Sequence, residues 1–177
     1  AVGGIAAFMS GANSKIVSSY CQCPNMTFNA NIPCNIGGLV GDMTSGTIEN
    51  SYSVAGITPG NANSQTHVGG IVGNITYGTF ANVYSGTSTR HFYGRTATNG
   101  LSFVNCYHQY SAPDNNIIVL TMTNGELAIS GVATPLRDTL HTWVQPYVNA
   151  QIKGYADWKD PSNPPQLELT GFITPSK

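Results

Sequence analysis

The feature that most constrains the fold is a recurrence of about 32 residues along the first two thirds of the chain. Gly-Gly-aliphatic blocks begin at Gly3, Gly37 and Gly69, and each is followed by a second block that ends in tyrosine. Those tyrosines, Tyr20, Tyr52 and Tyr84, lie 32 residues apart, and a degenerate fourth copy ends at Tyr107. A fixed period of this length, with β-branched and aromatic residues between Gly/Asn turns and no 3.6-residue periodicity, predicts strands that stack copy on copy.

We therefore expect an all-β fold, a right-handed parallel β-solenoid (β-helix) of about three to four coils. Matching residues of successive coils would lie about 4.8 Å apart. One row would hold Ile48, Phe80 and Phe103. A second row, of asparagines, would form an amide ladder at a coil corner and hydrogen-bond neighbouring backbone; its members are Asn50, Asn82 and Asn105.

A single coil cannot bury its apolar face, so the stack needs a cap. We expect residues 1–110 to form the repeats and residues 111–177 to form a small mixed α/β C-terminal cap, because the pattern changes at Ser111. Two short helices are predicted, one after the capping-box spacing Thr123-Asn124-Gly125-Glu126 and one after Thr134-Pro135. The apolar face of the second helix is expected to cover the last open coil, and a final strand is expected at 167–169.

Composition excludes several classes of function. Charged residues make up 8% of the chain and the formal net charge is -1, which argues against a nucleic-acid-binding surface. No apolar run is long enough to span a bilayer, so we expect no membrane insertion by this segment. No phosphate loop, Gly-x-Ser-x-Gly or His-Glu-x-x-His motif is present, and we expect neither cofactor nor metal.

The pattern Gly-Gly-Leu-Val-Gly followed by Gly-Thr-Ile-x-Asn-Ser-Tyr-Ser, found at residues 37–53, resembles the GLUG-motif repeats of bacterial cell-surface and secreted proteins. Residues 69–85 match nearly as well, and residues 1–20 are a looser copy. The resemblance implies an extracellular or cell-surface location in a bacterium, an adhesin-like role, and a place beside other domains of the same surface protein. It implies no ligand.

The expected function is therefore non-catalytic, adhesin-like binding of a glycan or of a host or partner protein. A purely structural stalk or spacer is the first alternative. A carbohydrate-active β-helix enzyme, a lyase or hydrolase, is the second. Such an enzyme would need paired acids or a nucleophile with its base. Asp42 and Glu49 are the acidic residues of the first 110, and they have Asn74 and Ala81 at the matching positions of the next copy.

Two groups of residues are candidates for ligand contact. An exposed row of tyrosines that includes Tyr52 and Tyr84 could stack on sugar rings, although internal or half-buried packing of the same row is the favoured alternative. The second group is a basic and aromatic cluster between the third and fourth copies, which could contact an acidic glycan or a protein; it contains Arg90, His91, Phe92 and Tyr93, with Arg95 beside it. His67, His91, His108 and His141 are scattered without metal-ligand spacing.

The four cysteines do not have the spacing of a zinc site. Three of them lie between the first and second copies, and in a secreted chain we expect Cys34 to pair with Cys23 or Cys21. Cys106 is expected to be a packed free thiol.

Overall fold

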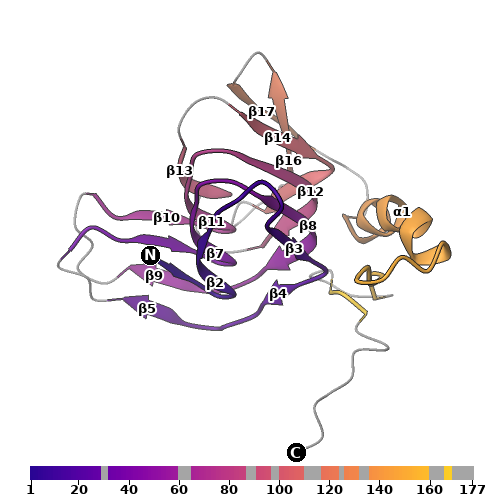
Figure 1. The fold of residues 1–177 in the computed structure, drawn as a ribbon, viewed down its shortest axis with the longest axis horizontal. Coiled ribbons are helices and arrows are strands. Elements are labelled where there is room, and N and C mark those ends of the chain that lie inside the picture. The colour runs from indigo at the N-terminus through magenta and orange to yellow at the C-terminus, as the bar shows by residue number, and fades with distance from the viewer. Residues whose placement is uncertain are drawn as a thin grey trace, which may run out of the picture.

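The computed structural model describes residues 1–28, 32–59, 65–86, 91–96, 100–109, 117–123, 126–131, 136–159 and 166–168. Within these residues the chain forms four β-sheets, whose strands are mostly parallel, and one α-helix near the C-terminus (Figure 1). Sheet A contains β1 (Val2–Gly3), β6 (Asn35–Gly37) and β10 (His67–Gly69). Sheet B contains β2 (Ala6–Met9), β7 (Val40–Met43), β11 (Val72–Ile75) and β13 (Tyr93–Thr96).

Sheet C is the largest, and it contains β3 (Lys15–Val17), β4 (Tyr20–Cys21), β8 (Thr47–Ser53), β12 (Gly78–Ser85), β14 (Leu101–Val104), β15 (Cys106–Gln109), β16 (Ile117–Thr123) and β17 (Glu126–Gly131). Sheet D pairs β5 (Met26–Phe28) with β9 (Ile57–Pro59).

The period of the sequence sets the register of the parallel strands. In β8 and β12, Ile48 pairs with Phe80 and Tyr52 with Tyr84, so partners lie 32 residues apart. The fourth copy follows after a shorter interval, yet its matching residues also pair in register, since Phe80 pairs with Phe103. The prediction that matching residues of successive copies lie beside each other is confirmed for these strands.

The repeated glycines allow sheets A and B to lie closer together than side chains would permit. A Cβ atom added to Gly37 would lie 2.7 Å from the backbone nitrogen of Gly73, and one added to Gly73 would lie 2.4 Å from the backbone nitrogen of Ile36. Real Cβ contacts are never that short, so backbone packs directly on backbone at these positions. The Gly-Gly-aliphatic-Val-Gly block is therefore the sequence signature of this contact.

The asparagine of each second block bends its strand. Asn50, Asn82 and Asn105 have φ angles of 44°, 57° and 52°, in the left-handed region that asparagine tolerates better than most residues. Because of this bend, residues on either side of Asn50 enter different cores. Ile48 is buried in the cluster enclosed by the sheets, whereas Tyr52 is buried in a second cluster beneath the C-terminal segment.

The expectation of a right-handed parallel β-solenoid with a mixed α/β cap is wrong. The described residues form four separate, mostly parallel sheets and a single C-terminal helix, without a clear solenoid. The Gly-Gly turns divide each copy into strands of separate sheets, and the bends at Ser18 and Asn105 divide the second block of the first and fourth copies into two short strands. In addition, β16 and β17 add to sheet C as an antiparallel pair, which breaks the parallel order at that end.

The C-terminal segment also differs from its prediction. The helix expected after the capping-box spacing is not formed, because Thr123 ends β16 and pairs with Glu126, which begins β17. Residues 124 and 125 lie outside the described residues. The second helix is present as α1 (Leu136–Asn149), and Leu136, Leu140 and Val144 are buried as its apolar spacing predicts. Its expected cap at Thr134 and Pro135 lies outside the described residues. Of the expected final strand at 167–169, residues 167 and 168 are described, and Leu167 forms an isolated antiparallel bridge with Trp158.

Helix α1 does not cover the end of the strand stack. It lies beside sheet C, at the level of β3, β8 and β12 (Figure 1). Its apolar face packs on the row formed by Tyr52, Tyr84 and Tyr107. The segment therefore buries the side of the repeats, where the aromatic row would otherwise meet water.

Candidate functional site

The side chains of the asparagine row, Asn50, Asn82 and Asn105, form hydrogen bonds both along the row and with the C-terminal segment. Asn105 Nδ2 donates to Asn82 Oδ1 at 2.6 Å, Asn82 Nδ2 donates to Asn50 Oδ1 at 2.7 Å, and Asn50 Nδ2 donates to Ser18 Oγ at 2.8 Å. The same amides also donate to backbone carbonyls of the C-terminal segment, with Asn82 reaching Leu140 at 3.0 Å. The row therefore serves the structure, as predicted for an amide ladder, and its hydrogen-bonding capacity is used internally.

The tyrosine row has no face available to a ligand at its centre. Tyr52 and Tyr84 are each 1% exposed, and the indole of Trp158 packs against Tyr52 with ring centroids 5.6 Å apart. Burial raises the pKa of Tyr52 and of Tyr84 to about 12. Of the two alternatives left open for these tyrosines, their positions correspond to internal packing.

The basic and aromatic cluster is split by the fold. Phe92 is buried against Phe80, its ring edge-on at 5.4 Å, and Tyr93 is half-buried over Phe103. Burial raises the pKa of Tyr93. His91 remains at the surface, and Arg90 lies outside the described residues.

The cysteines are free thiols in the structure, so the expected pairing of Cys34 with Cys23 or Cys21 is not formed. Cys23 is exposed and Cys34 is half-buried. Cys106 is a packed free thiol, as predicted, and burial raises its pKa to about 12.

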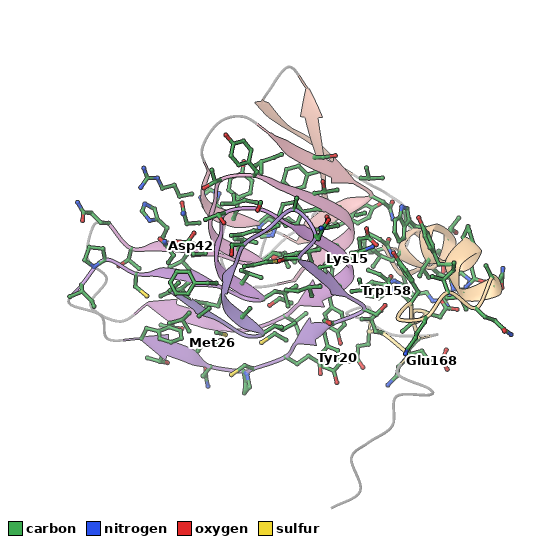
Figure 2. All side chains as sticks on the ribbon, viewed as in Figure 1. Lys15, Tyr20, Met26, Asp42, Trp158 and Glu168 are labelled. Carbon is green, nitrogen blue, oxygen red and sulfur yellow. The ribbon has the colours of Figure 1, made fainter. Side chains whose placement is uncertain are left out.

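The two acidic residues of the repeats have different surroundings. Glu49 accepts from Tyr155 and forms an ion pair of 2.8 Å with Lys15, and the hydrogen bond to Glu49 raises the pKa of Lys15. Asp42 lies on the other side of the molecule from Trp158 and the helix (Figure 2). It has no basic partner among the described residues and is bound by amides instead.

The surroundings of Asp42 form a strip of polar side chains across sheets A and B, which we call the polar strip; it consists of Asn35, Asp42, His67, Asn74 and Arg95. Asn35 donates to one carboxylate oxygen of Asp42 at 2.8 Å, and Asn74 donates to the other at 3.0 Å. His67 Nδ1 lies 3.1 Å from Asn35 Oδ1. Arg95, in register with Asn74, is exposed at the end of the strip.

The glycine contact between the sheets is what assembles this strip. Asn35 and His67 come from sheet A, while Asp42, Asn74 and Arg95 come from sheet B. A Cβ on Gly73 would lie 2.8 Å from the carbonyl carbon of Asn35, and one on Gly94 would lie 2.8 Å from that of His67. Only glycine at these positions lets the two rows of polar side chains meet.

Sequence reasoning treated Asp42 as an isolated surface acid and His67 as a scattered histidine, and it missed Asn35. One available signal could have found them. Asn35 and His67 are 32 residues apart, as are Asp42 and Asn74, so the repeat period already placed these residues in two rows.

The strip retains capacity for an external ligand. A carboxylate can accept about four hydrogen bonds and Asp42 uses two of them; each asparagine amide and the imidazole likewise has a remaining donor or acceptor. All four of these side chains are half-buried, so they are held in place while one side faces water. Such an array can hydrogen-bond groups that both donate and accept, such as hydroxyls.

Among the described residues, no group of three or more His, Cys, Asp or Glu is placed to hold a metal ion. Within the described residues, no helix is both long enough and apolar enough to cross a membrane. No family model matches the chain, and the comparisons with curated proteins and with solved structures likewise found no match.

Proposed function

We propose that the chain is a non-catalytic binding module of a secreted or cell-surface bacterial protein, and that it binds a glycan through the polar strip. The location is supported by the resemblance of residues 37–53 and 69–85 to GLUG-motif repeats. The ligand class is supported by the chemistry of the strip.

The observation that carries the proposal is the pair of hydrogen bonds that the Asp42 carboxylate accepts from side-chain amides, from Asn35 at 2.8 Å and from Asn74 at 3.0 Å. These hydrogen bonds fix a planar carboxylate between two planar amides, one from β6 in sheet A and one from β11 in sheet B. Asp42 and Asn74 lie in register on adjacent parallel strands, about 4.8 Å apart, so an acceptor and a donor are presented side by side to a ligand that carries several hydroxyl groups. Preorganised polar groups bind with a smaller loss of side-chain entropy than mobile ones.

Glycan arrays followed by titration calorimetry test the proposal. The wild-type chain should bind a subset of glycans, and Asp42→Asn should weaken that binding at least about tenfold, because the substituted amide cannot accept on both sides. The matched control is Glu49→Gln, which neutralises the other carboxylate of the repeats at a site remote from the strip. It should leave binding unchanged.

Two alternatives appear as outcomes of the same work. A wild-type chain that binds no glycan favours the purely structural stalk or spacer. Release of oligosaccharides from a polysaccharide, lost in Asp42→Asn and kept in Glu49→Gln, favours the carbohydrate-active enzyme.

A further inference from the structure

One row of side chains crosses all four strands of sheet B, which follow one another in the order β2, β7, β11 and β13 (Figure 1). The row consists of Phe8, Asp42, Asn74 and Arg95, each paired in register with the next. Residues in register on adjacent parallel strands lie on the same face of the sheet, about 4.8 Å apart. The row therefore contains three members of the polar strip and adds Phe8 at the end opposite Arg95.

The ring of Phe8 is open to water although its strand is packed. Phe8 is 69% exposed, whereas Met9, the next residue of β2, is 6% exposed and pairs with Met43. A single exposed apolar side chain needs no explanation by itself. Here, however, the register places the ring beside Asp42. An aromatic ring next to a few fixed polar groups is a combination found in ligand sites, and such a ring can stack on the apolar C–H face of a sugar.

The two charges of the row do not neutralise each other. Asn74 lies between Asp42 and Arg95, which are two strands apart, or ~9.6 Å. Asp42 accepts from Asn35 and Asn74, and in the part of the chain that the structure describes Arg95 has no acidic partner. Because Arg95 is also exposed, its guanidinium is available to an anion. The planar fork of an arginine matches a carboxylate through two parallel hydrogen bonds.

We propose that the glycan bound by the polar strip is an acidic oligosaccharide that lies along this row, an inference that rests on the proposed glycan binding. One sugar stacks on Phe8 and donates a hydroxyl hydrogen to Asp42, and a second sugar places its carboxylate at Arg95. A carboxylate on the first sugar would meet the negative charge of Asp42, and like charges in contact disfavour binding. The ligand class is therefore a glycan with a terminal acidic sugar, or one in which acidic and neutral sugars alternate.

Arg95 and Phe8 make different contributions to this recognition. The ion pair at Arg95 discriminates between the acidic and the neutral form of one sugar, and because it is exposed to solvent it weakens as salt is added. Stacking on Phe8 depends on apolar area, so it responds little to the charge of the ligand or to salt. Substitutions at the two ends of the row should therefore have different effects on binding.

A glycan array on which each sialylated or uronate oligosaccharide is printed beside its carboxyl-reduced form, followed by titration calorimetry on the best pair, tests the inference. The wild-type chain should bind the acidic form at least about tenfold more tightly than the reduced form. Arg95→Gln should bind both forms equally, at the affinity that the wild-type chain shows for the reduced one. Phe8→Ala should weaken both forms by a similar factor and keep the preference.

The matched controls lie in the C-terminal segment. Lys153→Gln removes an exposed cation, and Ile152→Ala removes an apolar side chain that is 49% exposed. Neither should change the affinity for either form of the sugar. All four substituted side chains are exposed, so thermal melting should show that each variant folds.

The inference is overturned if the wild-type chain binds the acidic and reduced forms equally, or if Arg95→Gln keeps the preference. Loss of binding in Asp42→Asn would then still support glycan binding at the polar strip. If the acidic preference is lost in Arg95→Gln while Asp42→Asn binds like the wild-type chain, the proposed function is wrong instead. A wild-type chain that binds no sugar on the array overturns both.

Discussion

Trp158 donates its indole N–H to the side-chain oxygen of Asn50 at 2.8 Å, across 108 residues of sequence. The same oxygen accepts from Asn82, while the Asn50 amide donates to Ser18 Oγ and to the carbonyl of Ala156. Asn50 thus uses both donors and both acceptor positions in a fully buried site. This residue joins the repeats to the C-terminal segment.

Replacing Trp158 should therefore weaken the whole fold. Trp158→Ala removes a side chain that is 0% exposed and should cost about 3–5 kcal/mol, and Trp158→Phe should cost about 1–3 kcal/mol through the lost hydrogen bond and the smaller ring. Urea unfolding followed by circular dichroism measures both. Trp143→Phe, at a half-buried ring, is the control and should cost less than either.

Two substitutions at Asn82 separate the contribution of its hydrogen bonds to stability from that of its left-handed backbone conformation. Asn82→Gly loses the side-chain bonds and keeps the φ angle of 57° without strain, while Asn82→Ala loses the bonds and adds strain. We expect Asn82→Ala to be less stable than Asn82→Gly by about 1 kcal/mol in denaturant unfolding. Equal stability of the two would mean that the backbone angle contributes nothing.

The glycine contact between sheets A and B should tolerate no side chain. A Cβ on Gly73 would lie 2.4 Å from the backbone nitrogen of Ile36. Gly73→Ala should therefore destabilise the fold by more than about 3 kcal/mol or prevent folding. The control, Gly154→Ala, meets nothing within 4 Å and should cost only the strain of its positive φ, about 1–2 kcal/mol. Comparable thermal melting of the two variants would contradict the close backbone packing.

The thiols should react in the order of their exposure. Because burial raises the pKa of Cys106 from 9.0 to about 12, its thiolate is scarce at pH 8 and shielded from reagents. Iodoacetamide should modify exposed Cys23 in the native protein and Cys106 only after unfolding, as peptide mass spectrometry can show. If no thiol is modified until a reductant is added, a disulfide is present and the free-thiol state is wrong.

The buried tyrosines should make the protein sensitive to alkali. Tyr52 and Tyr84 titrate at a pKa of about 12 when folded and near 10.0 when unfolded, so their contribution to stability is complete below pH 10 and is lost as the pH rises toward 12. The double variant Tyr52→Phe, Tyr84→Phe should move the midpoint of alkaline unfolding to higher pH, measured by circular dichroism. Tyr77→Phe, at an exposed ring, should leave the midpoint where it is.

The sequence by itself determined which residues of successive copies are neighbours. Tyr52 beside Tyr84, Asn50 beside Asn82 and Ile48 beside Phe80 follow from the period, because each contact between copies recurs and leaves a repeated signal. The buried face of α1 also followed from the sequence, because Leu136, Leu140 and Val144 have the spacing of one face of a helix.

The tertiary structure alone decided how those rows are used. The division into four sheets depends on where the chain bends, and the polar strip depends on how closely sheet A approaches sheet B at Gly73. The bond between Trp158 and Asn50 joins a segment that occurs once to a row that repeats. A contact made once has no periodic signal, so nothing in the recurrence could indicate that α1 covers the side of the strands rather than their end.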